Sequence, residues 1–255
     1  MSAGRILLLI PHPDDEVVGC AAAIGRARAA GAAVFGLYLT TGLPPPEALW
    51  RGQRRRYGER VALRREEALS AAAALGIEPL LFAARPSRRL KAELGAALGE
   101  IAAALRRCAA DAVWVSAWEG GHQDHDAANF LAARIADRVP VTEYAEYNYA
   151  GGAVRSQRFP RETGAETVLS LSAPEAAAKR DLLALYRSER ANLAHVRTAV
   201  ESLRPLPRHD YALPPHEGTL FRECFHWLPL RHPRVDFEPT GAVTAALAGF
   251  AAARA

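Results

Sequence analysis

The sequence predicts an α/β protein with a doubly wound, mostly parallel sheet and an irregular, proline-rich C-terminal cap. Three observations support this fold class. Short apolar runs alternate with alanine-rich helical segments through the first half of the chain, which is the pattern of repeated βαβ units. Clusters of histidine and aspartate follow two of the apolar runs, and prolines accumulate near the C-terminus without regular alternation.

The first βαβ unit begins close to the N-terminus. Residues 5–10 (RILLLI) form a continuous apolar run between glycine and proline, as in a strand buried on both faces. We expect a helix from about Glu16 to Ala30 that ends at Gly31, and then a second strand at Ala33–Thr40. This order predicts parallel strands joined by a right-handed crossover.

The alternation continues beyond this unit and makes the expected fold Rossmann-like. Glycine and proline mark most of the boundaries between elements. In chain order we expect a loop at Leu43–Trp50, a helix at Glu59–Leu75, a strand at Pro79–Ala84, a helix at Leu90–Cys108, a strand at Asp111–Ala117, a helix from His125 to about Arg138 and a strand near Val141–Tyr147.

The second half of the chain is less regular. A strand is expected at Thr167–Leu171 and a helix at Pro174–Ser188, with proline in its first turn. Seven prolines follow Arg204, so we expect an irregular cap there. Within this cap, Thr219–Leu228 is the best candidate for a strand.

Length and composition indicate one globular domain. The 255 residues are 50% hydrophobic and 24% charged, so the chain can bury a core. We expect a single domain, with a Rossmann-like core over about residues 1–200 and the cap over about 204–255. The net charge of +4 is a weak indication of anionic partners.

Several classes of protein are excluded by the sequence. No apolar run approaches the roughly 18 residues of a membrane span, and the N-terminal segment lacks the apolar core of a secretory signal. We therefore expect a cytoplasmic protein. Cys20, Cys108 and Cys224 are far apart and unpaired in spacing, which excludes a disulfide framework and a cysteine zinc knuckle.

Two polar clusters follow the first and fourth predicted strands. They are Pro11–Glu16 (PHPDDE) and Glu119–Asp126 (EGGHQDHD). In a doubly wound sheet of order 3-2-1-4, these two strands are neighbours, and ligands bind at the crevice between their C-terminal ends. The two clusters are therefore expected to meet at one site.

The residue types in these clusters suit a metal ion. Imidazole and carboxylate groups bind zinc, and a catalytic zinc site has three protein ligands with the fourth position left to water. His12, Asp15 and His125 supply two neutral ligands and one anion, which leaves positive charge to lower the pKa of the water toward about 7. We expect one Zn²⁺ per chain at these residues.

The neighbouring polar residues are candidates for acid–base chemistry. Adjacent carboxylates seldom point the same way, so Asp14 is free to act as general base. His122 can face the same cavity and stabilise an oxyanion or protonate a leaving amine, and Asp124 can orient a histidine. Acids at helix starts also complement the helix dipole, but that explanation leaves the three histidines unexplained.

The segments Pro11–Glu16 and His122–His125 resemble the two signature motifs of the PIG-L (LmbE-like) zinc deacetylases. This family hydrolyses N-acetyl groups, typically from N-acetylglucosamine joined to an aglycone, on a Rossmann-like fold. The resemblance covers most of the chain, although Gln123 stands where the family usually has proline. It implies that His12, Asp15 and His125 are the zinc ligands, with Asp14 as base and His122 as oxyanion or acid residue.

Two helical segments extend the resemblance. Residues 64–67 (RREE) are similar to an Arg-x-x-Glu helix whose arginine contacts substrate in relatives, which points to Arg64. Residues 179–188 (KRDLLALYRS) are similar to a late family helix, for which we expect a packing role. A further group that contacts the reaction intermediate is common in the family; the candidates left open are Arg155, Arg158, Arg161, Tyr147 and Tyr149.

Other residues have weaker claims to the site. Trp118 stands at the end of the fourth predicted strand, where its ring can stack on a sugar or simply pack in the core. His195 is expected on an amphipathic helix, and His216 and His226 are candidates to approach the site from the cap. The loop at Leu43–Gly58 and the cap are where we expect substrate choice, and the arginines in that loop would suit a phosphate, a carboxylate or a nucleotide-linked sugar.

The leading hypothesis is a zinc-dependent N-deacetylase, a hydrolase of linear amides, that releases acetate from an N-acetylglucosamine-type conjugate. The alternatives are metal-dependent hydrolysis of another amide or ester bond, or a Rossmann-like ligand-binding module. The module lacks support because the first turn has no G-x-G-x-x-G and places carboxylates where a pyrophosphate would sit. We expect a small-molecule substrate, no nucleic acid and no membrane span; the aglycone, homo-oligomer formation and zinc versus iron are left open.

Overall fold

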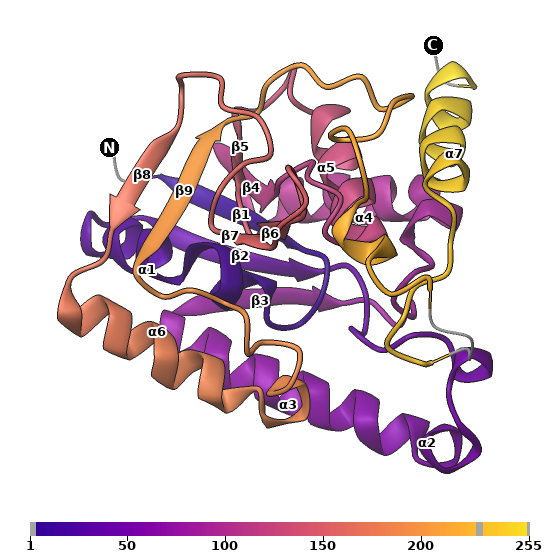
Figure 1. Ribbon diagram of the computed structural model, residues 1–255. Coiled ribbons are helices and arrows are strands. Elements are labelled where there is room, and N and C mark those ends of the chain that lie inside the picture. The colour runs from indigo at the N-terminus through magenta and orange to yellow at the C-terminus, as the bar shows by residue number, and fades with distance from the viewer. Residues whose placement is uncertain (1–3, 228–231, 254–255) are drawn as a thin grey trace.

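The protein is built around a seven-stranded sheet that is covered by helices on both faces (Figure 1). The computed structural model describes residues 4–227 and 232–253. The strands of this sheet are β1 (Arg5–Ile10), β2 (Ala33–Tyr38), β3 (Ile77–Phe82), β4 (Ala112–Ser116), β5 (Val141–Tyr144), β8 (Thr167–Ser170) and β9 (Val200–Pro205). They lie in the order β3-β2-β1-β4-β5-β9-β8. The five from β3 to β5 are parallel, and β9 is antiparallel to both β5 and β8.

The remaining elements are helices and one small hairpin. The α-helices are α1 (Asp15–Ala29), α2 (Arg51–Arg55), α3 (Tyr57–Leu75), α4 (Leu94–Cys108), α5 (Gln123–Ala133), α6 (Ala173–Leu185) and α7 (Thr240–Ala252). The short 3-10 helices are η1 (Pro46–Ala48), η2 (Leu90–Ala92), η3 (Arg187–Glu189) and η4 (Phe221–Glu223). The hairpin pairs β6 (Tyr147–Asn148) with β7 (Arg155–Ser156).

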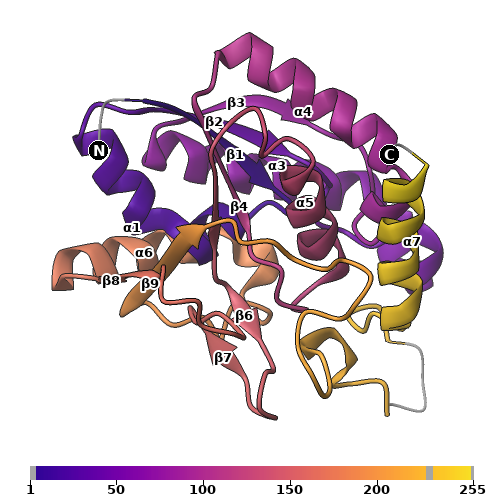
Figure 2. The ribbon, with the colours of Figure 1, turned by 90° about the horizontal axis from the view of Figure 1, so that it is seen from above.

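The apolar run of β1 is buried on both sides, as the sequence predicts. Leu7 and Leu9 point to the face that α4 and α5 cover. Ile6, Leu8 and Ile10 point to the other face, which α1, α3 and α6 cover. Figure 2 shows these two helical layers on opposite sides of the sheet. A strand that is apolar on both faces can sit only in the middle of such a sandwich.

The first βαβ unit agrees closely with the predicted one. The strand over residues 5–10 is confirmed as β1, and α1 begins and ends within one residue of the predicted helix. Gly76 ends α3 in the left-handed conformation, with φ 66°, which explains why glycine marks this helix terminus. Cys20 is buried in the core between α1 and the sheet, in keeping with the absence of paired cysteines.

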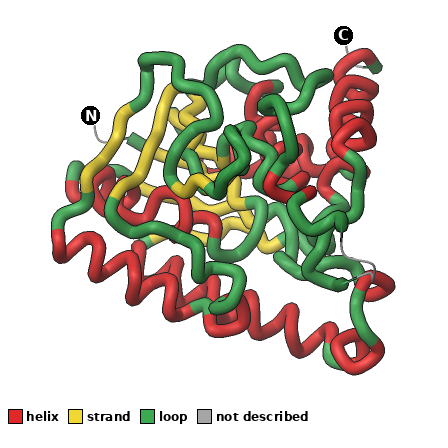
Figure 3. The backbone as a smooth tube through the Cα atoms, viewed as in Figure 1, coloured by secondary structure: helices red, strands yellow, loops and turns green. Residues whose placement is uncertain are grey.

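The predictions for the cap are partly wrong. The strand expected at Thr219–Leu228 is not formed over the described residues, where η4 and turns occur instead; Leu228 lies outside the described residues. His195 lies in a turn and not on a helix. Loops make up most of the chain between β9 and α7 (Figure 3), because frequent prolines interrupt both hydrogen-bonded ladders and helices.

Other element predictions differ from the structure in their ends or were not made. The fifth helix ends at Ala133 and not near Arg138. The helix α2 forms within the region expected to be loop, and α7 forms in the cap. The residues of α7 are apolar on nearly all sides, so they lack the amphipathic periodicity by which a surface helix is recognised in sequence.

None of the described helices combines the length and apolar character needed to cross a membrane. The cytoplasmic location and the division into core and cap stay predictions from the sequence.

Candidate metal centre and active site

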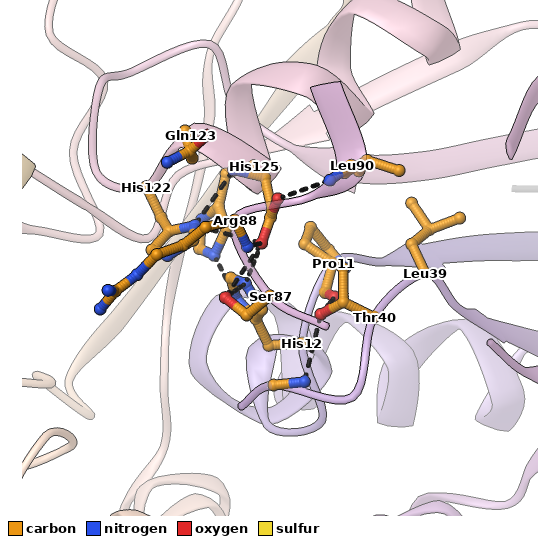
Figure 4. Close-up of polar contacts among 12 residues, drawn as sticks. Pro11, His12, Leu39, Thr40, Ser87, Arg88, Leu90, His122, Gln123 and His125 are labelled. Carbon is orange, nitrogen blue, oxygen red and sulfur yellow. Dashed lines mark hydrogen bonds and ion pairs between the residues drawn. The ribbon is translucent and has the colours of Figure 1, made fainter. Parts of the chain in front are cut away.

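The two polar clusters of the sequence meet at one edge of the sheet. Because β1 and β4 are adjacent and parallel, the loops that follow them leave the sheet side by side. One loop carries His12 and leads to Asp15 at the start of α1, and the other leads to His125 in the first turn of α5. Figure 4 shows His12, His122 and His125 gathered at this point beside Ser87 and Arg88.

Three side chains form the tightest cluster. The Nδ1 atom of His12 lies 3.1 Å from Nε2 of His125. One carboxylate oxygen of Asp15, Oδ2, lies 3.3 Å from that Nδ1 and 3.2 Å from that Nε2. In a tetrahedral zinc site with bonds of about 2.0–2.2 Å, two ligand atoms are separated by about 3.3–3.6 Å. The three atoms therefore nearly outline one face of a tetrahedron and could hold a metal ion.

The charges around this cluster favour a cation. Burial by itself lowers the pKa of His12, but the carboxylates of Asp15 and Asp124 outweigh burial and raise that pKa to about 10. Burial raises the pKa of Asp15, yet His125 and His12 hold it well below its usual range. A buried site that stabilises positive charge on an imidazole also stabilises a metal ion in the same place.

A second group of potential ligands is already occupied by hydrogen bonds. His12, His122 and Asp124 also bring ligand atoms close together. However, Oδ2 of Asp124 lies 3.0 Å from both Nε2 of His12 and Oγ of Ser87, and it accepts from the backbone N–H of Arg88 at 2.6 Å. This oxygen is better described as fixing the ring of His12, whose Nδ1 is then left for a metal.

Asp14 lines the cavity, as Asp15 does, and its carboxylate is held by Arg64. Its oxygen Oδ2 accepts from the guanidinium of Arg64 at 3.2 and 3.3 Å. Asp14 has φ 125°, a left-handed value that is strained for a residue other than glycine and that costs about 1–3 kcal/mol. Burial raises the pKa of its carboxyl group well above the usual value, while Arg64 acts in the opposite direction. Such a carboxylate can accept a proton near neutral pH.

His122 caps the N-terminus of α5 through its ring. Its Nδ1 accepts a hydrogen bond from the backbone N–H of Asp124 at 3.0 Å. Burial and the neighbouring His12 lower the pKa of His122 well below its usual value, so the ring is neutral. With Nδ1 engaged as an acceptor, the single ring proton belongs on Nε2, which makes Nε2 a hydrogen-bond donor.

Glu146 lies behind the metal cluster. Its oxygen Oε1 is 3.6 Å from Nδ1 of His125, on the opposite side of the ring from the cluster. Both side chains are fully buried, and these atoms have no hydrogen-bond partner within the described part of the chain. Glu119 holds the backbone of Glu146 by accepting its N–H at 2.8 Å. No motif in the sequence indicates Glu146, because it reaches the site from the short segment between β5 and β6.

The cluster opens into a large cavity of about 910 Å³. His12, Asp14, Asp15 and His122 line one end of it, and Arg64 lines it beside Asp14. Much of the remaining wall is apolar and comes from loops; it includes Leu43, Leu49, Val154, Leu193, Val196, Phe221, Phe225 and Val235. The volume is several times that of one acetylated sugar ring, so a substrate with a further group fits.

The structure separates the predicted site residues into three groups. His12, Asp14, Asp15, His122 and Arg64 line the cavity, and the fully buried His125 and Asp124 lie behind its wall. Tyr147 and Tyr149, which were left open, also line it. His195 also lines it, whereas the candidates that do not line it are Arg155, Arg158, Arg161, His216 and His226.

The sugar-stacking role expected for Trp118 is corrected by its position. Trp118 is 3% exposed and belongs to the hydrophobic core on the α4–α5 side of the sheet. Its ring packs edge to face on Tyr211, with centroids 4.9 Å apart. It does not line the cavity. The end of a strand carries side chains to both faces, and Trp118 faces the core.

Comparisons with known proteins agree with the geometry. The family described as GlcNAc-PI de-N-acetylase (PIG-L) matches residues 7–136. No curated protein matches the sequence at a significant level.

Solved structures share the fold at low sequence identity. A deacetylase of the teicoplanin biosynthetic pathway is 22% identical, with TM-score 0.64, over 79% of this chain and 97% of the other. An N,N'-diacetylchitobiose deacetylase from Pyrococcus horikoshii is 17% identical, with TM-score 0.58, over 84% and 85%. A 4-carboxy-2-hydroxymuconate hydratase from Pseudomonas putida is 19% identical, with TM-score 0.53, over 82% and 98%. The same fold therefore supports more than one reaction.

Proposed function

The chain belongs to the PIG-L family, and on that premise we propose that it is a zinc-dependent N-deacetylase that releases acetate from an N-acetylated amino sugar. The observation that carries the proposal is the placement of a base beside a metal cluster. Asp14 lines the cavity next to Asp15, whose carboxylate contacts both His12 and His125. Hydrolysis of an amide needs these parts together at one end of a cavity.

The residues proposed to hold the metal are His12, Asp15 and His125. Two nitrogen ligands and one carboxylate suit zinc, and three protein ligands leave a position for a water molecule or a substrate oxygen. When bound, zinc supplies Lewis-acid chemistry, by which a water molecule is acidified and a carbonyl group is polarised. Asp124 and Glu146 contact the outer nitrogens of the two histidines and would fix their orientation.

Asp14 is the proposed general base. Its carboxylate accepts the proton of the attacking water and can later deliver that proton to the departing amine, so the proton count balances. Arg64 holds one oxygen of this carboxylate at 3.2 Å from its guanidinium. The other oxygen is left for the water. We assign Arg64 a role in positioning Asp14, in addition to the substrate contact that the family resemblance implies.

His122 is proposed to stabilise the oxyanion. Its ring is neutral and carries its proton on Nε2, because Nδ1 accepts from the backbone of Asp124. A neutral imidazole donates a hydrogen bond to the acetyl oxygen as negative charge develops there. This assignment leaves Asp14 as the proton donor to the amine, because a histidine with a strongly lowered pKa has no spare proton to give.

The substrate class follows from the family and from the neighbours' activities. The solved relatives named above include deacetylases of a glycopeptide pathway and of N,N'-diacetylchitobiose. We propose an N-acetylglucosamine-type conjugate as substrate, with the acetyl group at the metal end of the cavity and the aglycone toward the loop-built walls.

The test is acetate release from a panel of N-acetylglucosamine conjugates, with the metal content of the same protein measured alongside. We expect acetate in amounts equal to the free amino sugar, and about one zinc per chain in the active protein. A protein that binds zinc but releases acetate from no member of the panel, while hydrating an unsaturated carboxylate, would refute the proposed reaction.

A further inference from the structure

Arginines line the cavity together with the carboxylates of Asp14, Asp15, Glu189 and Asp236. Among the described residues these arginines number five, of which Arg64 and Arg222 form ion pairs with buried aspartates. The other three, Arg60, Arg88 and Arg234, form no ion pair with any residue in the ranges 4–227 and 232–253. An unpaired cation in a cavity wall favours an anion in the cavity.

Arg60 is the most informative of the three. The guanidinium of Arg88 already donates to the backbone carbonyls of Pro233 at 2.8 Å and Val235 at 3.1 Å, and Arg234 is exposed. Arg60 is half-buried, and its Nη1 is sealed from solvent without a hydrogen-bond partner among the described residues. A buried guanidinium nitrogen without a partner is unfavourable unless a ligand supplies one.

The position of Arg60 relative to the metal end follows from the helix α3. Arg60 stands four residues before Arg64, and both side chains line the cavity. Four residues of an α-helix span about 6 Å along the axis. Since Arg64 contacts Asp14, Arg60 is offset from that contact by about this distance along α3, which is comparable to the width of one sugar ring.

The acids around this end of the cavity are committed to other cations. Glu47 pairs with Arg89, and Glu59 pairs with Arg56. Glu189 lies 3.6 Å from Arg64. These three carboxylates therefore already have basic partners, and Asp236, which also lines the cavity, accepts a hydrogen bond from Gln123.

We propose that Arg60 forms a subsite for a negatively charged group on the aglycone of the substrate. The proposal rests on the proposed deacetylase function and narrows it to acidic amino-sugar conjugates. The acetyl group lies at the metal end, the sugar ring spans the turn between Arg64 and Arg60, and the anion meets Arg60. Phosphate and carboxylate groups share the chemistry that a guanidinium recognises.

The test compares three substrates that differ only in the group on the anomeric carbon. These are methyl N-acetylglucosaminide, N-acetylglucosamine 1-phosphate and the carboxymethyl glycoside of N-acetylglucosamine. We expect the wild-type enzyme to show a kcat/KM for at least one charged substrate that exceeds that of the methyl glycoside by roughly tenfold or more. The phosphate and carboxylate arms tell which anion the subsite takes.

The decisive variant is Arg60→Gln, for which the ratio of charged to neutral kcat/KM should fall close to one. Because the ratio is taken within one protein, a partial folding defect cancels. Arg55→Gln is the matched control, since Arg55 is exposed on α2 and does not line the cavity; its ratio should equal that of the wild type.

The outcomes separate the two proposals. Hydrolysis of all three substrates without preference for a charged one, or a preference that survives in Arg60→Gln, overturns the subsite and leaves the deacetylase function intact. Failure to release acetate from any of the three by zinc-loaded protein, together with no binding of the 1-phosphate in calorimetry, counts against the deacetylase function and overturns the subsite with it. A preference lost in Arg60→Gln and kept in Arg55→Gln supports the subsite.

Discussion

The two halves of the chain contribute different things to the same cavity. From β1 to α5, parallel strands end in short loops that carry His12, Asp15 and His125 into contact within 3.3 Å. From β5 to α7, long irregular segments supply apolar walls such as Phe221 and Phe225. Rigid strand ends fix the reacting groups, whereas loops can vary without disturbing the sheet. The difference teaches that strand ends carry the proposed reacting groups, whereas the loops that complete the cavity wall come from both halves, with Leu43 and Leu49 from the first.

The largest expected effects fall on the strand-end half, and two variants separate its two functions. His125→Ala removes a proposed metal ligand, so it should lose both bound zinc and acetate release. Asp14→Asn should retain zinc and lose turnover by about 10²–10⁴-fold, because only the base is removed. Metal analysis and acetate assays on the same preparations check both. Loss of zinc in Asp14→Asn, or full activity in either variant, would contradict the assignment.

The next effect tests whether Glu146, which follows β5 in the other half, supports the metal cluster. Glu146→Leu removes the carboxylate 3.6 Å from Nδ1 of His125. We expect zinc affinity to fall by about 10–100-fold, as for other residues that orient a metal ligand. The thermal midpoint of the metal-free protein should stay the same or rise, because a buried carboxylate without a partner is replaced by an apolar group.

Competition with a chelator of known affinity measures this zinc affinity, and calorimetry measures the midpoint. Glu146→Gln serves as the conservative variant and should recover part of the affinity, since its amide oxygen can still accept from His125. Equal zinc affinity in the wild type and in Glu146→Leu would show that Glu146 does not support the cluster.

A smaller effect is expected in the cap. Phe225 lines the cavity and is 51% exposed without a substrate. Phe225→Ala should raise KM for conjugates with a large apolar aglycone by about fivefold, with kcat little changed, because the lost contact lies away from the reacting atoms. Trp227→Ala is the control, since Trp227 is 73% exposed and does not line the cavity. A change in kcat rather than KM would show that Phe225 acts on the chemical step and would contradict its assignment to the binding of the aglycone.

The smallest effect concerns stability far from the cavity. Hydrogen bonds from Arg26 lower the pKa of Glu175 to about 2 from its usual 4.5. A carboxyl group with a lowered pKa stabilises the fold above pH 4.5, and that contribution disappears as the pH falls from 4.5 toward 2. The melting temperature of Glu175→Gln should therefore lie below that of the wild type at pH 7 and approach it in acid. A gap that is constant with pH would show that Glu175 acts only through its cap on α6.

The fold can be predicted from the sequence best where local signals and burial agree. The strand β1 and the helix α1 were predicted closely because an apolar run must be buried on both faces and glycine stops the helix. The helix α7 was missed because it is apolar on nearly all sides, and η4 replaced the strand expected there because prolines flank it. Whether these segments form a helix depends on their packing against distant parts of the chain, which a short stretch of sequence does not reveal.

The residues of the site likewise divide into those that the sequence predicts and those that it does not. The metal cluster and Asp14 could be identified because histidines and aspartates are concentrated in two short segments at adjacent strand ends. Glu146 and Arg60 could not, because each is an ordinary residue whose neighbours come from distant parts of the chain. The sugar-stacking role predicted for Trp118 is wrong because its position in the sequence indicates the end of the strand but not the face of the sheet to which its ring turns.

The central claim is that His12, Asp15 and His125 hold one catalytic metal ion. The most direct measurement is anomalous diffraction at the zinc edge from crystals of the zinc-loaded protein. We predict one strong peak, about 2.0–2.2 Å from Nδ1 of His12, Oδ2 of Asp15 and Nε2 of His125. A peak bound instead by Asp124 and His122, or no ordered peak in protein that releases acetate, would contradict the account.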